Sequence, residues 1–362
     1  MARETSGASI RRRRTRRATG AESDHSARRL NTRQTLSGLV YDPAGRGAQL
    51  IGMATAEATT SAQIPDFGGP WFMSPFFEDM LAERDLDAEA EKLVRSFATR
   101  GYAIVDDLGF EDFDALADRV TADMEPLHEA GRYNRVMDAW TVSDAVRAVA
   151  TCPRILHTLE LLYGRRPIPF QTLNFLRGSQ QPTHSDAYHF HSFPKHFMCG
   201  VWVAFEDIDD ANGPLHYYPG SHRLPDYDFL CPHREEEMRD FVQELIPKYG
   251  LEKQHAYLKR GQALIWSANL LHGGDPVSDP DSTRRSQVTH YYFADCTYCT
   301  PFRSDFARGR VYFRQIVDVG TGELQPLRFN GGRVRPPLVS RLVTLRRRAE
   351  RMLGRGYVQY PA

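Results

Sequence analysis

The chain has 362 residues, enough for one large domain or two modest ones. Its 46 basic and 46 acidic residues cancel, so bulk charge does not favour a nucleic-acid partner. No apolar stretch approaches the roughly 20 residues that span a bilayer, and we expect a cytoplasmic protein without a membrane partner. The five cysteines are scattered, which is typical of idle thiols in a reducing compartment.

Residues 1–66 are rich in Arg, Ser, Thr, Ala and Gly and show no sustained apolar period. Such a composition does not bury enough apolar surface to offset the entropy lost on ordering, so we expect a disordered tail. The arginine run at residues 11–17 is typical of a solvated segment, and contact with nucleic acid or an acidic surface is the alternative.

Folded sequence begins near Phe67, and helical patterns come first. Apolar residues at helical spacing predict three helices, around residues 86–97, 113–124 and 156–162. Gly101 is expected to end the first helix and Gly164 the third. The pattern then changes to short strands separated by Gly, Pro, Asp and Asn turns. The predicted strands are 102–105, 168–176, 199–205, 214–218, 262–266, 285–293 and 311–317.

This order of elements predicts a mainly β domain over residues 67–330, in which a helical layer packs on a jelly-roll barrel. Two further segments interrupt or follow this domain. Residues 226–254, rich in charge and aromatics, are inserted between strands as a candidate lid. Residues 331–362 carry an apolar stripe between arginines, which indicates a basic amphipathic helix that packs on its own domain.

A short polar motif, His184-Ser185-Asp186, follows one of the predicted strands. On an extended strand, residues two apart project to the same face, so His184 and Asp186 are expected to point together and Ser185 away. His272, after the apolar run at 263–266, is the best candidate for a third ligand. Two histidines and one carboxylate leave open positions on ferrous iron for a cosubstrate and oxygen. The sequence therefore predicts an iron site.

Six groups of residues occur along the chain in a fixed order. They are Gln171-Thr172-Leu173-Asn174-Phe175, His184-Ser185-Asp186, Val201-Trp202-Val203-Ala204, Asn212-Gly213-Pro214-Leu215, Pro219-Gly220-Ser221-His222, and His272-Gly273-Gly274 followed by Arg284-Arg285-Ser286. This series resembles the phytanoyl-CoA dioxygenase family, whose members are iron(II)- and 2-oxoglutarate-dependent oxygenases. The resemblance covers roughly residues 85–320 and implies a double-stranded β-helix fold. It also implies that His184, Asp186 and His272 are the iron ligands.

The same resemblance places Arg284 where the family has the arginine that pairs with the distal carboxylate of 2-oxoglutarate. A guanidinium suits that task because its planar fork makes two charge-assisted hydrogen bonds. Arg285 would point to the opposite face of the strand and is the alternative if the register differs by one residue. Trp202 occupies a position that lines the cosubstrate pocket in relatives, with core packing as the other interpretation. Gln171 is expected to bind cosubstrate or substrate, or to satisfy a buried backbone group.

Four more residues near these motifs are candidates for a substrate pocket: Asn174, Tyr188, His189 and His191. His189 and His191 also have the spacing of a cupin metal site, which calls for a glutamate a few residues later. The sequence has Phe193-Pro194-Lys195 there instead. His222 is expected to be structural, within a turn.

These features together predict an iron(II)- and 2-oxoglutarate-dependent dioxygenase that uses O2 to hydroxylate an unactivated carbon of a small-molecule metabolite. The products from the cosubstrate are succinate and CO2. Asp186 speaks against halogenation, because halogenating relatives replace this carboxylate with a small residue. Two alternatives remain: a cupin-type metal enzyme that does not use 2-oxoglutarate, and a non-catalytic binding protein on the same barrel. The sequence gives no indication of oligomeric state.

Overall fold

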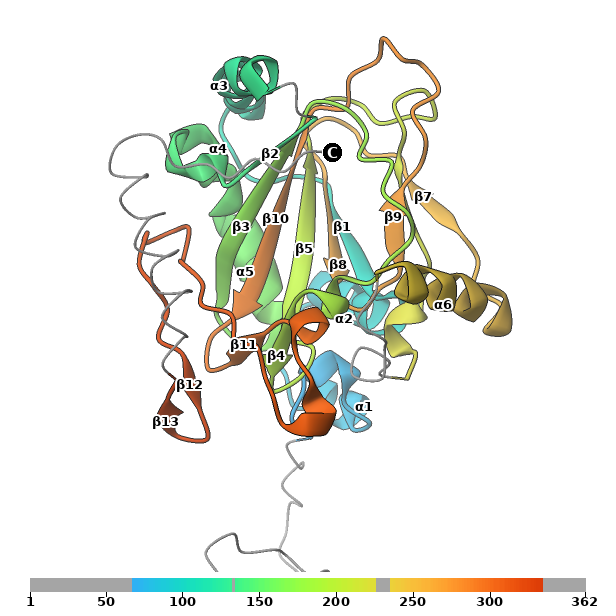
Figure 1. The fold of residues 1–362 in the computed structure, drawn as a ribbon, viewed down its shortest axis with the longest axis vertical. Helices are drawn as coiled ribbons and strands as arrows, with labels where there is room; N and C mark the ends of the chain where they lie inside the picture. The colour runs from blue at the N-terminus through green and yellow to red at the C-terminus, as the bar shows by residue number, and fades with distance from the viewer. Residues whose placement is uncertain (1–66, 132–133, 226–234, 335–362) are drawn as a thin grey trace, which may run out of the picture. The chain divides into compact units, whose positions relative to one another are not determined.

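The central element is a six-stranded sheet in which every neighbouring pair of strands is antiparallel (Figure 1). Its strands lie in the order β1 (Tyr102–Val105), β8 (Ala263–Ser267), β5 (Met198–Ala204), β10 (Ser286–Phe293), β3 (Pro167–Phe175) and β2 (Arg135–Met137). Strands β5 and β10 are buried along their whole length. Both faces of the sheet are therefore covered by other elements.

The computed structural model describes residues 67–131, 134–225 and 235–334. The predicted N-terminal tail and C-terminal helix lie outside these residues. Everything described here belongs to one compact unit, Ala62–Ala362. Within it, no described helix is both long and apolar enough to cross a bilayer.

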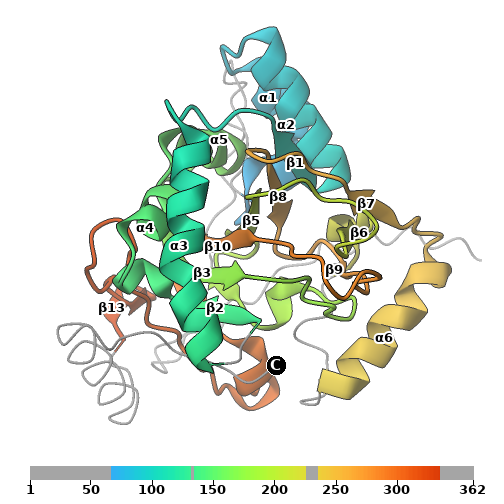
Figure 2. The same cartoon turned by 90° about the horizontal axis from the view of Figure 1, so that it is seen from above.

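Helices cover one face of the large sheet, as the two views agree (Figures 1 and 2). They are α1 (Phe77–Ala82), α2 (Ala88–Arg100), α3 (Phe113–Gly131), α4 (Asp144–Ala150) and α5 (Pro153–Tyr163). Phe97, Val146 and Leu159 from these helices pack in one core with Val201 and Tyr291 of the sheet. This core anchors the sheet from behind, so its other face is free to build a site.

Local sequence sets the helix ends. Asp87 caps α2 by accepting a hydrogen bond from the Ala90 amide over 2.8 Å. Gly101 ends α2 in the left-handed conformation with φ of 81°, where glycine avoids the clash of a side chain. Helix α5 begins at Pro153 and ends at Gly164, whose φ is 71°.

A second, three-stranded antiparallel sheet packs on the opposite face of the large sheet. It consists of β7 (Gln254–Ala256), β6 (Leu215–Tyr217) and β9 (His272–Gly274). Leu215 and Tyr217 share a core with Trp202, Leu264 and Val288. Because Val201 and Val203 face the helices while Trp202 and Ala204 face the small sheet, β5 alternates between two cores.

The remaining described elements are one helix, two strand pairs and six 3-10 turns. Helix α6 (Glu235–Lys248) lies in the predicted lid segment. Two small strand pairs are β4 (His191–Phe193) with β11 (Thr297–Cys299), and β12 (Arg328–Phe329) with β13 (Gly332–Arg333). The 3-10 turns are η1 (Trp71–Met73), η2 (Ala139–Thr141), η3 (Asp186–Tyr188), η4 (Ser221–Arg223), η5 (Pro301–Arg303) and η6 (Phe306–Arg308).

The predicted mainly β fold with a helical layer is confirmed at the level of antiparallel sheets and flanking helices. Six of the seven predicted strands are present. The strand predicted at 311–317 is wrong. That segment makes only isolated bridges, Phe313 with Cys299 and Val317 with Leu324, because no partner runs beside it for two consecutive residues.

Candidate metal centre

The two histidines of the predicted iron site are joined through their backbones. The His184 amide donates to the His272 carbonyl over 2.8 Å, and the His272 amide donates back over 3.0 Å. This bridge brings together residues 88 positions apart in the chain. The extended conformation expected for residues 184–186 continues only as far as Ser185. The chain turns into η3 at Asp186, where the Ser185 hydroxyl accepts a hydrogen bond from the Ala187 amide. Ser185 still points away, donating to the Ala268 carbonyl over 3.2 Å.

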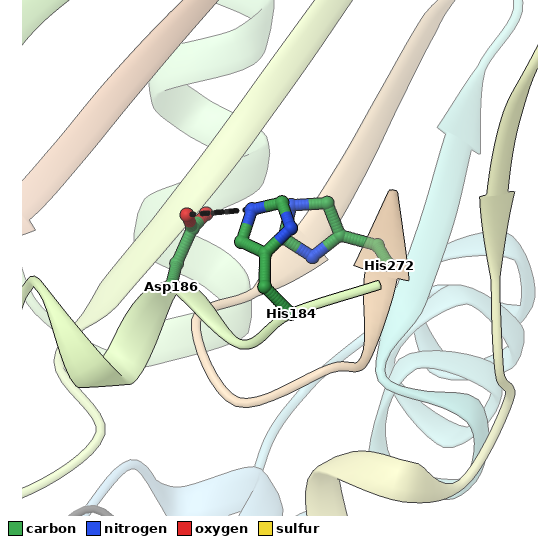
Figure 3. A group of neighbouring side chains, drawn as sticks. All are labelled: His184, Asp186 and His272. Carbon is green, nitrogen blue, oxygen red and sulfur yellow. Dashed lines mark ion pairs between the residues drawn. The ribbon is translucent and has the colours of Figure 1, made fainter. Parts of the chain in front are cut away.

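His184, Asp186 and His272 form the metal cluster, whose three side chains point toward one another (Figure 3). Asp186 Oδ1 lies 3.8 Å from His184 Nε2, and Asp186 Oδ2 lies 3.7 Å from His272 Nε2. One ligand atom from each residue lies within 4.8 Å of the others. The cluster therefore presents two nitrogens and one carboxylate to a common point.

Hydrogen bonds set the tautomers of both histidines. His184 Nδ1 donates to the Pro182 carbonyl over 2.8 Å, and His272 Nδ1 donates to the Leu270 carbonyl over 2.9 Å. A carbonyl can only accept, so the proton is on Nδ1 and the lone pair is on Nε2 in each ring. Both lone pairs face Asp186. Metal-binding histidines are typically held in this way.

The electrostatics leave the cluster in the protonation state that a metal needs. Burial raises the pKa of the Asp186 carboxyl, but three adjacent histidines and a hydrogen bond from Trp266 bring it down to about 2. Burial lowers the pKa of His184 to about 4 and also lowers that of His272. At neutral pH the carboxylate is charged and both imidazoles are neutral, as ligands of a divalent cation must be.

Two glycines after His272, Gly273 and Gly274, allow this part of the chain to approach the segment that carries His184. A Cβ atom on Gly273 would lie 2.7 Å from the Gln181 carbonyl oxygen and 2.7 Å from His216 Nε2. A Cβ atom on Gly274 would lie 2.5 Å from the Ser179 hydroxyl. Neither space admits a side chain, so the His-Gly-Gly sequence is what permits the bridge between β9 and the segment that carries His184.

The metal cluster opens into a cavity of about 740 Å³ between the two larger sheets. Arg284 lies in its wall and is buried, with its Nη1 donating to the Gly213 carbonyl over 2.7 Å. Its Nε has no partner among the described residues, and its Cζ is 5.2 Å from the Trp202 ring centroid. Burial lowers the pKa of Arg284 to about 10, so the guanidinium is still charged at neutral pH.

The neighbouring arginine faces the other way. Arg285 Nη1 lies 3.3 Å from Glu206 Oε2, and the Arg285 amide donates to the same carboxylate over 2.6 Å. Arg284 is thus the cation with spare donors inside the cavity, and Arg285 is neutralised outside it. Of the two arginines that the sequence left open, Arg284 is the one that lines the cavity. The donor left over on Arg284 fits the second carboxylate of a dicarboxylic cosubstrate.

Comparison with known proteins agrees with this geometry. The family model "Phytanoyl-CoA dioxygenase (PhyH)" matches residues 84–286. The chain belongs to the phytanoyl-CoA dioxygenase family. Within the family, a probable phytanoyl-CoA dioxygenase of Caenorhabditis elegans is 29% identical over 183 residues, which are 49% of this chain and 54% of that protein. The peroxisomal phytanoyl-CoA dioxygenase of Rattus norvegicus is 28% identical over 125 residues, which are 33% of this chain and 36% of that protein.

The chain thus spans about half the length, or less, of these curated relatives. Among solved structures, the epimerase SnoN in complex with Fe3+, alpha ketoglutarate and nogalamycin RO matches with a TM-score of 0.50 and 22% identity. The match covers 68% of this chain and 96% of SnoN. At this identity it supports the fold that this phytanoyl-CoA dioxygenase family member shares with SnoN.

Two further predicted residues line the cavity of this family member. Trp202 is almost fully buried on the inner face of β5, beside Arg284. Gln171 lies on the inner face of β3, where its Oε1 accepts a hydrogen bond from His290 Nδ1 over 2.8 Å. Gln171 therefore orients His290, which lies beside the metal cluster. In the described contacts the Gln171 side chain forms no hydrogen bond with a backbone group.

Of the four candidates for a substrate pocket, only His189 lines the cavity. Asn174 lies on the helix-facing side of β3, where it bonds Gln287 over 3.1 Å. Tyr188 is buried in a separate core with Tyr218. His191 is buried in β4, paired with β11. Asn174, Tyr188 and His191 do not line the cavity in the structure, and their role in a substrate pocket stays a prediction.

Sequence reasoning missed His290. Its Nε2 lies 3.8 Å from Asp186 Oδ2, in the cavity wall. Its pKa is lowered by burial, and the charges of Arg314 and Arg135 lower it further, so both cations lie close to it. His290 lies six residues after Arg284, and a period of two places both on one face. That spacing was the available signal.

A second polar group, the closed cluster, consists of Thr183, His216, Asp275, Lys253 and His255. His216 Nδ1 donates to Asp275 Oδ1 over 2.7 Å, and His216 Nε2 accepts from the Thr183 hydroxyl over 2.8 Å. Lys253 Nζ and His255 Nε2 each lie 2.6 Å from the Asp275 carboxylate. Thr183 directly precedes His184, so the closed cluster fixes the chain beside a residue of the metal cluster.

Proposed function

We propose that this chain is an iron(II)- and 2-oxoglutarate-dependent dioxygenase that hydroxylates an unactivated carbon of a small molecule. The observation that carries the proposal is one cavity that holds both the metal cluster and the spare donors of Arg284. The two packed sheets around it support a double-stranded β-helix. In this proposal residues 67–330 form the oxygenase domain, between an N-terminal tail and a C-terminal helix.

Each residue has a definite task in this proposal. His184, Asp186 and His272 hold iron(II) through two Nε2 atoms and one carboxylate, leaving positions open toward the cavity. Bound iron, with 2-oxoglutarate and O2, supplies the oxidising power for C–H hydroxylation, and succinate and CO2 are released. Arg284 binds the distal carboxylate of 2-oxoglutarate with its planar fork.

Other side chains position these groups and exclude water. Trp266 donates its indole hydrogen to Asp186 Oδ2 over 2.9 Å, which orients the carboxylate toward the histidines. Trp202 covers the Arg284 guanidinium, so the cosubstrate carboxylate meets its partner away from bulk water. Gln171 and His290 form a fixed pair beside the open side of the cluster. His189 is proposed to contact the substrate.

The direct test is anaerobic titration of 2-oxoglutarate into iron(II)-loaded protein. Chelation of iron by the keto acid gives a metal-to-ligand charge-transfer absorption band, which we expect to saturate at one equivalent per chain. Admitting oxygen should then produce succinate. A chain that binds iron but never develops the band would favour the cupin-type alternative. A chain that binds no iron would favour the non-catalytic alternative.

A further inference from the structure

The cavity beside the metal cluster carries more positive than negative charge. Its lining includes four arginines and two aspartates: Arg135, Arg284, Arg303, Arg314, Asp138 and Asp186. The proposed function uses one charge of each sign, because Asp186 binds iron and Arg284 binds 2-oxoglutarate. Among the other lining cations, Arg314 is the one whose described contacts include no carboxylate and lead toward the metal cluster. A negatively charged substrate complements it.

The described contacts of the Arg314 guanidinium are all with neutral groups. Its Nε donates to the Thr300 hydroxyl over 3.2 Å, and its Nη2 donates to the His189 carbonyl over 3.4 Å. Its Cζ lies 4.6 Å from the centroid of the Phe190 ring. Within the ranges that the structure describes, no carboxylate forms an ion pair with it. The guanidinium is oriented, while its charge is not compensated.

Other arginines of the same segment are neutralised. Arg308 Nη1 lies 2.8 Å and Arg310 Nη2 lies 2.7 Å from Asp305 Oδ2. Both are exposed, whereas Arg314 is half-buried in the cavity wall. An arginine usually enters a partly buried site with a partner, because an unpaired charge is costly away from water. The missing partner of Arg314 therefore points to a ligand.

Arg314 also lies on the substrate side of the metal cluster. It stacks on Phe190, whose ring centroid is 5.0 Å from that of His290. His290 in turn lies beside Asp186. Arg284 lies six residues earlier on the same chain segment, roughly 20 Å along an extended strand. One arginine is thus placed for the cosubstrate and another for a second anion.

We infer that the substrate is an organic anion, a carboxylate or a phosphate on a partly apolar body, and that Arg314 anchors it. The apolar part faces Phe190, Phe302 and Phe313, which line the same cavity. Its volume of about 740 Å³ lies within the range of roughly 300–1,000 Å³ that holds small molecules. This inference rests on the proposed function for the identity of the site.

The test is calorimetric binding of matched probes to iron(II)-loaded protein saturated with 2-oxoglutarate under anaerobic conditions. The probes are phenylalkanoates of two to six side-chain carbons, the corresponding phenylalkyl phosphates, and the neutral amides of the same acids. We expect at least one anion to bind about tenfold or more tightly than its uncharged counterpart, as a charged hydrogen bond requires. The tighter series shows whether the anion is a carboxylate or a phosphate. A series in which no anion binds more tightly than the amides overturns the inference.

Arg314→Gln should remove this preference, while Arg308→Gln, in the same segment, should keep it. Equal melting temperatures of the two variants show that the change is local. Undiminished anion preference in Arg314→Gln overturns the assignment to Arg314. Repeating the titration on metal-free Arg284→Gln protein separates the two proposals, because Arg314 needs neither iron nor 2-oxoglutarate. The anion can bind to this variant while the iron-loaded wild type shows no charge-transfer absorption with 2-oxoglutarate. That pair of results would refute the oxygenase proposal and leave the anion-site proposal standing.

Discussion

The metal cluster and the closed cluster use the same residue types and differ in what their polar atoms face. In the closed cluster, both ring nitrogens of His216 form hydrogen bonds. The Asp275 carboxylate contacts three nitrogen groups, on His216, Lys253 and His255. In the metal cluster, the backbone bonds Nδ1 of both His184 and His272, and their Nε2 atoms turn toward Asp186 and the cavity, where the Gln181 amide approaches His184 Nε2 to 3.3 Å.

The difference shows how a site can be recognised in this fold. A histidine with an aspartate is satisfied and structural when the protein itself supplies every partner, as around Asp275. It is a candidate ligand set when two imidazole nitrogens and a carboxylate converge on one point without bonding one another, as around Asp186. A similar comparison distinguishes Arg284, which lines the cavity and has no carboxylate partner among the described residues, from Arg285, which is paired with Glu206.

The largest expected effect comes from removing one member of the metal cluster. Asp186→Ala, His184→Ala and His272→Ala should each weaken iron(II) binding by about 100-fold or more, since only two protein ligands remain. Metal analysis after anaerobic reconstitution and desalting measures this. Full iron occupancy in any one of the three variants would remove that residue from the ligand set.

The matched control is Asp275→Ala. It strips the closed cluster of its carboxylate, so we expect the free energy of unfolding to fall by about 2 kcal/mol. Iron should still bind stoichiometrically, because the metal cluster is intact. Loss of iron from the folded Asp275→Ala protein would erase the distinction between the two clusters.

The next largest effect concerns the two adjacent arginines. Arg284→Ala should weaken 2-oxoglutarate binding by about 100-fold or more, because a charge pair broken on one side costs about 3–5 kcal/mol. Arg284→Lys should be intermediate, since it keeps the charge and loses the fork. Iron affinity should hold in both. Titration of the charge-transfer absorption measures the cosubstrate affinity.

Arg285→Ala is the control for this pair. Its partner Glu206 is outside the cavity, so cosubstrate binding should stay within about twofold of wild type. If Arg285→Ala is the damaging change and Arg284→Ala binds 2-oxoglutarate normally, the assignment moves to Arg285.

Much of the fold followed from local patterns. The strand signals at β5 and β8 were strong because apolar runs, Val201–Ala204 and Ala263–Trp266, are buried on both faces. The ligand histidines and Asp186 were found from a motif and a resemblance. Arg284 was assigned from the resemblance, and the period of two predicted only that Arg284 and Arg285 face opposite sides. The same period would have indicated that His290 shares the face of Arg284.

The rest depended on contacts between short segments. Strand β6 was predicted, but β7 and β9 have three residues each, too few for alternation to show. The register of these three strands is what assembles the closed cluster. Arg314 was assigned to a strand that does not form. Its position depends on single bonds, such as its amide donating to the Tyr298 carbonyl over 2.7 Å. No periodic signal encodes such a contact.

A smaller effect is expected at the glycine between the two clusters. Gly273→Ala places a methyl group against the Gln181 carbonyl and the His216 ring, so one cluster must shift. We expect a loss of about 1–3 kcal/mol in unfolding free energy. Iron affinity should fall about tenfold, because the backbone bridge to His184 is disturbed. Denaturant unfolding and metal titration measure the two effects.

Gly332→Ala is the matched control, because a Cβ atom there comes no closer than 3.6 Å to its neighbours. Stability and iron affinity should both stay near wild type. A Gly273→Ala protein that is indistinguishable from Gly332→Ala would show that the two clusters are not coupled through this glycine.

The smallest expected effect concerns a buried histidine outside both clusters. His222 Nε2 donates to the Ala98 carbonyl over 3.2 Å, and burial lowers its pKa to about 4. An unfolded histidine has a pKa of about 6.5, so between pH 6.5 and 4 the unfolded state binds a proton that the folded state excludes. Stability from this group is complete above pH 6.5 and falls with decreasing pH, by roughly 2 kcal/mol at pH 5.

His222→Gln keeps a donor for Ala98 without titrating, so its unfolding free energy should change less between pH 7 and 5 than that of wild type. His157→Gln, at an exposed position on α5, is the control and should keep the wild-type slope. Equal slopes in His222→Gln and wild type would mean that His222 does not resist protonation, and the acid sensitivity would then belong to the histidines of the two clusters.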